Sequence, residues 1–204
     1  MSRKTLSTPG SLPSPGAKRK TAPRRPLSSV RILAGKWKGR LLAVPAGTRP
    51  TSGRAREALF DILQAAIPGS RVLDLFAGSG AVGLEALSRG AARAVFVEKD
   101  ADDVNANLAR LGAGSGEAVV VAEDAGQAAA SLARRGEEFD LIFADPPYAL
   151  GDTALSRSVV ALLAPGGRLI VQSDSGEKAP TLPGVSPAGR RAYGRNVFWF
   201  FEAP

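Results

Sequence analysis

From residue 71 onward, the sequence alternates short apolar runs with stretches of helical periodicity, and this alternation limits the possible folds more than any other feature. Apolar runs predict strands near 71–76, 94–98, 118–122, 139–144, 167–172 and 196–202. Helical patterns lie between them, near 80–89, 100–111, 125–135 and 152–163. This order predicts an α/β fold, a mostly parallel sheet with helices on both faces. The last run follows a short non-helical segment, which predicts an antiparallel final strand.

Length and composition exclude several classes of protein. The 204 residues suffice for one domain with a full core. Cysteine and histidine are both absent, so we expect no disulfide, no thiolate or histidine catalyst and no metal site built from either residue. No apolar run approaches the ~18 residues of a membrane span, and no signal-peptide core follows the amino terminus. We expect a monomeric cytoplasmic protein with no membrane partner.

Charge is distributed very unevenly along the chain. Residues 1–60 contain 14 Lys/Arg and one acid, a balance of +13, whereas residues 61–204 contain 13 Lys/Arg and 18 acids, a balance of −5; the two sum to the net +8. A basic front half on an acidic body predicts a polyanionic partner, most simply a nucleic acid. A solvated basic face without a partner is the alternative.

The amino-terminal 28 residues are rich in Pro, Ser, Thr and basic residues and contain no acid. Such a segment buries too little apolar surface to offset the entropy of ordering, so we predict a disordered basic tail over residues 1–28. An organellar transit peptide has a similar composition, but the prolines argue against an amphipathic mitochondrial one.

Residues 29–69 predict a small hairpin followed by a helix. Val30–Gly35 and Arg40–Val44 flank a basic, aromatic tip of sequence Lys-Trp-Lys-Gly. Apolar residues at helical spacing then predict a helix over Arg54–Leu63, with Thr51 or Ser52 as its cap.

Two arginines, Arg54 and Arg56, fall in the first turn of this helix. The helix dipole makes cations unfavourable there, so their presence suggests that an anion binds nearby. A surface helix with no bound anion is the alternative.

A strand, a glycine turn and a helix start follow one another over residues 71–85. Gly78, Gly80 and Gly83 satisfy the spacing G-x-G-x-x-G, and Glu98 ends the next strand. This is the dinucleotide-binding pattern, so an NAD-dependent dehydrogenase is one possible function.

Carboxylates near this turn favour a different cofactor. Asp74 lies just before the turn, where it would repel an NAD pyrophosphate but suit a cationic cofactor such as S-adenosylmethionine. Glu98 can accept hydrogen bonds from both ribose hydroxyls. Asp124 follows the third predicted strand, where it can accept from an adenine amino group, cap the following helix, or do both.

The stretch Asp145–Tyr148, Asp-Pro-Pro-Tyr, ends the fourth predicted strand. Its two prolines fix φ, so Asp145 and the carbonyl of Pro146 are held stiffly beyond the strand. Two acceptors beside the Tyr148 ring suit a flat substrate with an exocyclic amino group. An ordinary Pro-Pro turn with a surface tyrosine is the alternative.

Together these motifs resemble class I methyltransferases of the small-subunit rRNA (guanine-N2)-methyltransferase family, the RsmD type. The resemblance runs from about Val30 to Glu202, and Gly53 stands where the family usually has Asp. The segments that carry it are Arg31–Arg40, Arg49–Glu57, Asp74–Gly80 with Gly83–Leu87, and Asp145–Tyr148.

The resemblance implies a Rossmann-like sheet of seven strands over residues 70–204, preceded by residues 29–69 as an RNA-contacting extension. It also implies methyl transfer from S-adenosylmethionine to the N2 amino group of a guanine in 16S rRNA. The implied catalytic residues are Asp145, Pro146, Pro147 and Tyr148. The cofactor residues are Asp74, Phe76, Ala77, Gly78, Gly80, Glu98 and Asp124. The substrate residues are Lys36, Trp37, Lys38, Arg40, Arg49, Thr51, Arg54 and Arg56.

Three rival functions stay open on sequence grounds. A DNA or other RNA amino-group methyltransferase, acting on N6 of adenine or N4 of cytosine, would share the cofactor, although a DNA enzyme usually needs a further target-recognition domain. A protein-glutamine methyltransferase would prefer Asn at the position of Asp145. A non-catalytic RNA-binding module would need no cofactor. For an enzyme, we expect the site at the carboxyl ends of the first and fourth predicted strands.

Overall fold

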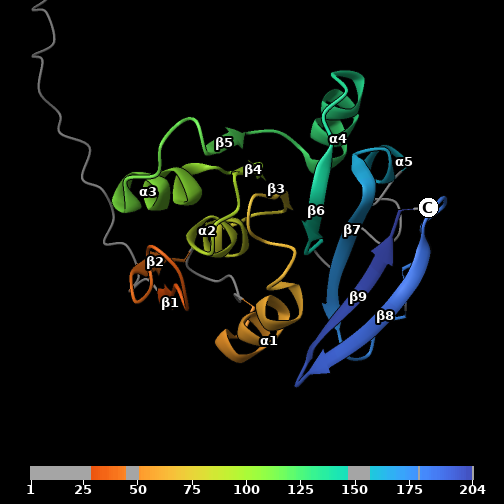
Figure 1. Cartoon of the computed structure of the whole chain (residues 1–204), viewed down its shortest axis with the longest axis horizontal. Coiled ribbons are helices and arrows are strands. Elements are labelled where there is room, and N and C mark those ends of the chain that lie inside the picture. The colour runs from red at the N-terminus through yellow and green to blue at the C-terminus, as the bar shows by residue number, and fades with distance from the viewer. Residues whose placement is uncertain (1–28, 45–50, 147–156, 179, 204) are drawn as a thin grey trace, which may run out of the picture.

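The computed structural model describes residues 29–44, 51–146, 157–178 and 180–203 (Figure 1). Two sheets and five helices form within these ranges. In chain order the elements are β1 Ser29–Arg31, β2 Leu41–Ala43, α1 Gly53–Leu63, β3 Arg71–Leu75, α2 Ala81–Ser88, β4 Arg93–Val97, α3 Asp102–Leu111, β5 Ala118–Val121, α4 Ala125–Arg134, β6 Phe139–Ala144, α5 Arg157–Val160, β7 Leu163–Asp174, β8 Ser186–Tyr193 and β9 Asn196–Glu202.

The main sheet has seven strands in the order β5-β4-β3-β6-β7-β9-β8. Neighbours from β5 through β7 are parallel, whereas β9 is antiparallel to both β7 and β8. This arrangement confirms the predicted seven-stranded, mostly parallel sheet and its antiparallel last strand. Strand order reverses between β3 and β6, so their carboxyl ends adjoin at the topological switch point, where ligands of open α/β sheets bind.

Apolar side chains fill both faces of the sheet. On one face, the core joins residues of α1, α2 and α3 to the strands, among them Leu59, Leu84 and Phe96. On the other face, α4 and α5 pack through residues such as Ala128 and Val159. Helices therefore cover both faces, as the alternating pattern predicted (Figure 1).

Two elements of the carboxyl-terminal third differ in extent from the predictions. The fifth strand of the alternation starts at Leu163 rather than at 167, because a bulge in β7 lets Phe139 pair with Leu163 before Leu141 pairs with Arg168. Gly166, at φ 72°, accommodates that irregularity. Of the predicted helix over 152–163, α5 holds four residues, and 152–156 lie outside the described residues. Strand β8 was not predicted; its residues were expected to belong to a short non-helical segment.

The extension in front of the sheet has the predicted hairpin and helix. Strands β1 and β2 pair antiparallel, with Val30 opposite Leu42. The side chain of Ser52 caps α1 by accepting from the backbone N–H of Ala55. Gly53 is exposed and its backbone has open space around it, so the structure gives no reason why Asp would be required there. Within the described ranges, no helix is long and apolar enough to cross a membrane.

Candidate active site at the switch point

The turn between β3 and α2 has a backbone that few residues other than glycine can adopt. Gly78 and Gly80 have φ of 54° and 76°, and Phe76 is the one described non-glycine residue with positive φ, at 61°. A Cβ on Gly80 would lie 2.7 Å from Val104 Cγ2, and one on Gly83 would lie 2.3 Å from the Phe96 ring. These two glycines therefore allow close packing of the turn against its own core.

Gly78 differs from the other two glycines because nothing lies within 4 Å of where its Cβ would be. Its backbone N–H donates to Glu98 Oε2 at 2.7 Å, and Glu98 Oε1 accepts weakly from Asp100 N at 3.4 Å. Open space beside a glycine backbone and a carboxylate fits a bound ligand with hydroxyl groups. The neighbouring Phe76 and Ala77 are half-buried in the same turn.

Asp74 lies in β3 directly before this turn and is 2% exposed. Its Oδ2 accepts from the backbone N–H of Gly83 at 2.9 Å, and no described Lys or Arg forms an ion pair with it. The pKa of Asp74 is raised to about 8, mainly by burial; the Gly83 hydrogen bond opposes this shift, and the charges of Asp145 and Glu98 contribute to it. A buried carboxyl group without a cation fits a ligand that brings positive charge.

Asp124 follows β5 and caps α4, since its Oδ1 accepts from the backbone N–H groups of Gly126 and Gln127 at 3.0 and 3.4 Å. The predicted cap is therefore confirmed. The second predicted role, a contact with an adenine amino group, stays a prediction.

Asp145 lies one residue beyond β6, beside the end of β3, where Leu75 pairs with Ala144. Its pKa is raised to about 7, mainly by burial and in smaller part by the charges of Asp174 and Glu177. Carboxyl groups with raised pKa values in one place are typical of functional sites. Pro146 is half-buried next to it, whereas Pro147 and Tyr148 lie outside the described residues.

A chain of hydrogen bonds connects Asp145 to the start of α1. Gln172, buried in β7, donates from Nε2 to Asp145 Oδ2 at 3.0 Å. The Gln172 Oε1 accepts from Thr51 Oγ1 at 2.8 Å. The two bonds hold Oδ2 in place while Oδ1 receives no hydrogen bond from a described residue. Thr51 was predicted to bind substrate, but nothing in the sequence pointed to Gln172.

A buried carboxylate, Glu85, connects the extension to α2 through hydrogen bonds. Its side chain is 0% exposed and accepts from the backbone N–H groups of Leu33 and Ala34 at 2.8 and 3.0 Å. Arg89 Nε donates to it at 2.8 Å and Arg56 Nε lies 3.9 Å away. Glu85 lay within a motif of the resemblance, but its structural role was not predicted.

Arg56 was predicted to bind the substrate, but its side chain is buried in this structure, at 1% exposed. Its Nη2 donates to the carbonyl of Arg31 at 2.6 Å, and burial lowers its pKa despite the opposing charge of Glu85. Arg56 faces the core side of α1, whereas Arg54 is exposed. Arg56 therefore connects α1, which carries it, to the hairpin through Arg31 and to α2 through Glu85.

Among the other predicted substrate residues, some side chains already contact other parts of the protein and some are exposed without an ion pair. Lys36 forms an ion pair with Glu117 and lies over the Trp37 ring, 4.1 Å from its centroid. Arg40 donates to the carbonyl of Arg110 at 2.7 Å. Within the described part of the chain, Lys38 and Arg54 are exposed and pair with no carboxylate. Arg49 lies outside the described residues.

Asn107 of α3 joins the extension to the glycine turn and was also missed. It is 0% exposed, and its Nδ2 donates to the carbonyls of Ala43 and Ser79 at 2.8 and 3.0 Å. Ala43 N donates back to its Oδ1 at 2.9 Å. A buried asparagine with several backbone partners cannot be recognised from sequence spacing.

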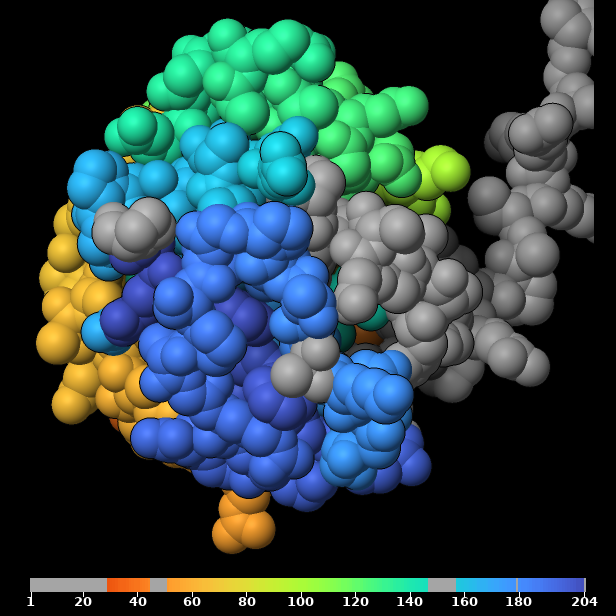
Figure 2. Space-filling view, turned by 90° about the vertical axis from the view of Figure 1, so that its right-hand side faces the viewer, coloured from red at the N-terminus to blue at the C-terminus, as the bar shows by residue number. Residues whose placement is uncertain are grey.

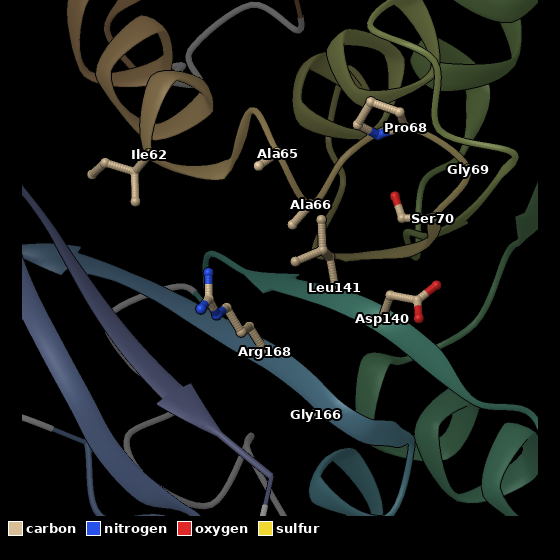
Figure 3. Close-up of a pocket in the computed structure, with 10 residues that line it drawn as sticks. All are labelled: Ile62, Ala65, Ala66, Pro68, Gly69, Ser70, Asp140, Leu141, Gly166 and Arg168. Carbon is tan, nitrogen blue, oxygen red and sulfur yellow. The ribbon is translucent and has the colours of Figure 1, made fainter.

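A hollow of about 510 Å³ lies away from all of these residues (Figure 3). It is bordered by Ile62, Ser70, Asp140 and Arg168, from the end of α1 and the amino-terminal parts of β6 and β7. The switch point is at the opposite edge of the sheet. None of the predicted site residues lines the hollow, so we do not assign the candidate site to it.

The chain is similar to a family described as conserved hypothetical protein 95, whose model matches residues 30–202. Among curated proteins, ribosomal RNA small subunit methyltransferase D of Escherichia coli K12 is 40% identical over 165 residues, covering 76% of this chain and 79% of that protein.

Solved structures agree with this match. A hypothetical protein of Thermus thermophilus superposes with a TM-score of 0.74 at 40% identity, over 85% of this chain and 99% of that one. A candidate methyltransferase of Escherichia coli, yhhF, superposes with the same TM-score at 36% identity, over 86% and 98%. The similarity therefore spans the extension, the glycine turn and the strand ends together.

Proposed function

Because the chain belongs to the conserved hypothetical protein 95 family, the RsmD-type rRNA methyltransferases, we propose that it methylates the N2 amino group of a guanine in 16S rRNA. The methyl donor is S-adenosylmethionine. The substrate follows from the curated relative, which is named a methyltransferase of small-subunit rRNA. We further propose that the protein acts as a monomer in the cytoplasm, where ribosomal subunits are found.

One observation supports the proposal most directly: two carboxyl groups, Asp74 and Asp145, meet at the adjoining ends of β3 and β6, and neither forms an ion pair with a Lys or Arg of the described residues. A cationic methyl donor and a neutral amino group that becomes positive during transfer both suit such a pair. An NAD-dependent dehydrogenase would have to place a pyrophosphate beside Asp74, which charge repulsion disfavours.

The cofactor end of the site consists of the β3–α2 turn and the end of β4. Asp74 would offset the positive charge of the cofactor, Glu98 would accept from its ribose, and the open side of Gly78 would admit it. Phe76, Ala77 and Gly80 shape the same turn, and Asp124 would meet the adenine amino group. When bound, S-adenosylmethionine supplies a methyl group already activated on sulfonium, so the chemistry needs neither histidine nor cysteine.

The substrate end orients the guanine amino group. The lone pair of this nitrogen is delocalised into the base, which makes it a weak nucleophile. An ionised Asp145 and the carbonyl of Pro146 would accept its two N–H groups and aim the lone pair at the methyl carbon. Such positioning can contribute roughly 7–11 kcal/mol at best, and the carboxylate also stabilises positive charge developing on nitrogen. Stacking on Tyr148 and on Pro147 would hold the unstacked base, with roughly 1–3 kcal/mol from the aromatic ring.

The extension over residues 29–69 would hold the RNA beside this site. Lys38 and Arg54 are free for phosphates, whereas Lys36 and Arg40 would first have to leave Glu117 and the Arg110 carbonyl. Residues 1–28 would add counter-charge, and the methyltransferase domain would comprise residues 70–204.

The test is mass spectrometry of 16S rRNA from a strain that lacks the gene. We expect one N2-methylguanosine to be lost, and to return when purified small subunits are incubated with the protein and S-adenosylmethionine. An unchanged set of methylated nucleosides in the deletion strain would refute the proposed reaction.

A further inference from the structure

The hairpin of β8 and β9 forms a second basic surface, separate from the extension. From Lys178 through Phe201 the sequence contains four cations and no acid, although residues 61–204 as a whole carry a balance of −5. Most of β8 is exposed, including Arg190 and Arg191, and so is Arg195 in the turn. Figure 2 looks onto this end of the molecule, where the hairpin covers much of the visible surface.

Strand register brings the tip of this hairpin to the edge of the sheet that holds the candidate site. Gln172, which donates to Asp145, pairs with Phe198 of β9, and Phe198 pairs with Arg191 of β8. Arg191 is thus level with Asp145 and three strand spacings away, about 14 Å at ~4.8 Å per spacing. The turn after Tyr193 extends beyond that level, and in Figure 1 the same tip lies near α1.

The side chains at the tip suit a strand of nucleic acid. The Tyr193 ring packs against Phe198 with centroids 6.2 Å apart, so its position is fixed. Arg190 lies over the Trp199 ring at 5.3 Å, and Arg191 donates one N–H to the Arg190 carbonyl. Within the described ranges, no carboxylate pairs with any of these arginines. Guanidinium groups bind phosphates through paired donors, and aromatic faces bind bases.

We propose that Arg191, Tyr193 and Arg195 bind the RNA strand that flanks the target nucleotide, next to the contacts made by the extension. Within β8 and the turn after it, residues 186–195, the sequence has no acid, although Asp174 of β7 pairs with Asn196 beside this turn. Cations together with an aromatic ring favour a polyanion with bases over other occupants. This inference rests on the proposed rRNA substrate and adds a second set of RNA contacts to the substrate site. Contacts from the hairpin tip and from the extension together would hold the strand in register while one base leaves its stack.

The test compares two double variants that each remove two positive charges. Arg191→Gln/Arg195→Gln alters the hairpin tip. Arg134→Gln/Arg135→Gln is the matched control, because these exposed arginines end α4 at the opposite edge of the sheet. Binding of protein-free 16S rRNA is measured over a series of salt concentrations. Each lost phosphate contact flattens the slope of log affinity against log salt by about 0.7 on single strands.

We expect the slope of the hairpin variant to be shallower than that of the wild type by about 1.4, because two phosphate contacts of about 0.7 each are lost. The control should keep the wild-type slope. Equal slopes in both variants and wild type would overturn the inference. The single variant Arg195→Gln repeats the test should the double variant unfold. If wild-type protein methylates 16S rRNA but the slopes do not differ, the hairpin inference alone fails. Absence of any methyl transfer by the wild type would instead count against the proposed function.

Discussion

The two carboxyl groups at the switch point are adjacent but are held in different ways. Asp74 receives its hydrogen bond from Gly83, nine residues ahead in the same strand–turn–helix unit. Asp145 receives its hydrogen bond from Gln172 in the next strand, and Gln172 in turn is bonded to Thr51 of the extension. The cofactor end is therefore built largely within one short stretch, whereas the substrate end is assembled from three distant segments.

This difference suggests how binding and catalysis are divided. Asp74 is fixed by the backbone N–H of Gly83 in the same strand–turn–helix unit, which gives a cofactor site whose form does not depend on the RNA. A carboxyl group held through Thr51 and Gln172 has its orientation linked to the segment that leads into α1, which we expect to contact RNA. Variants at the two ends should therefore affect different measurable steps.

The largest effect is expected from Asp145→Ala. Loss of the acceptor that orients the amino group should abolish methyl transfer, while cofactor affinity stays within a few-fold because the turn after β3 is untouched. Tyr148→Ala should be impaired less severely. Methyl transfer to small subunits and calorimetric titration with S-adenosylmethionine measure the two properties. Near-normal turnover of Asp145→Ala would rule out the proposed orientation of the amino group.

Glu98→Ala should give the next largest effect, and at the cofactor end alone. It removes hydrogen bonds from a charged acceptor, worth about 1.5–3 kcal/mol, so the affinity for S-adenosylmethionine should fall roughly 10- to 100-fold. RNA affinity should not change. Titration calorimetry checks the first value and filter binding the second. Tighter binding of NAD than of S-adenosylmethionine by the wild type would contradict the whole assignment.

Gln172→Leu should have an intermediate effect, at the substrate end. Without the Nε2 donor, the ionised form of Asp145 loses a hydrogen bond, so turnover should fall about tenfold for a loss near 1.4 kcal/mol. The pKa of Asp145 should also rise, which moves the acidic limb of the pH–rate profile to higher pH. Thr51→Val should produce a smaller change in the same direction, because it removes only the second bond of the chain.

Ser173→Ala is the matched control for Gln172→Leu. Ser173 is the next residue of β7, and its hydroxyl accepts from Trp199 Nε1 at 3.0 Å without contact to Asp145. Its pH–rate profile should match that of the wild type. If Gln172→Leu also kept the wild-type profile, Gln172 would have no part in orienting Asp145.

The last effect expected is on stability, which should change with pH, and it is separate from the effects on activity. Both carboxyl groups have raised pKa values in the folded protein, about 8 for Asp74 and about 7 for Asp145, against ~3.9 when unfolded. The folded state then binds more protons than the unfolded state, so the free energy of unfolding should fall as pH rises from about 4 to about 8. Asp74→Asn should remove the fall in the free energy of unfolding between pH 7 and 8. Asp145→Asn should keep the fall in that range. Thermal unfolding of cofactor-free protein across this range measures both slopes, and an unchanged slope in Asp74→Asn would contradict the assignment.

The amino-acid sequence by itself determined those parts of this protein that depend on local patterns. The alternation after residue 71 predicted the sheet, the glycine spacing predicted the turn after Asp74, and Asp145 followed from the prolines beside it. The hairpin and α1 were predicted in the same way. Each of these inferences uses residues within about 15 positions of one another. Over such distances hydrophobic periodicity and turn-forming residues determine the local backbone structure.

Only the tertiary structure decided which side chains meet across the chain. Arg56 and Arg54 look alike in the sequence, but packing buries the first against Glu85, 29 positions away, and leaves the second in solvent. Strand β8 lacks an apolar alternation because it forms an exposed edge, so its place beside β9 could not be read locally. Gln172 acquires its link to Asp145 from the pairing of β6 with β7, since burial removes water as the alternative partner for its amide.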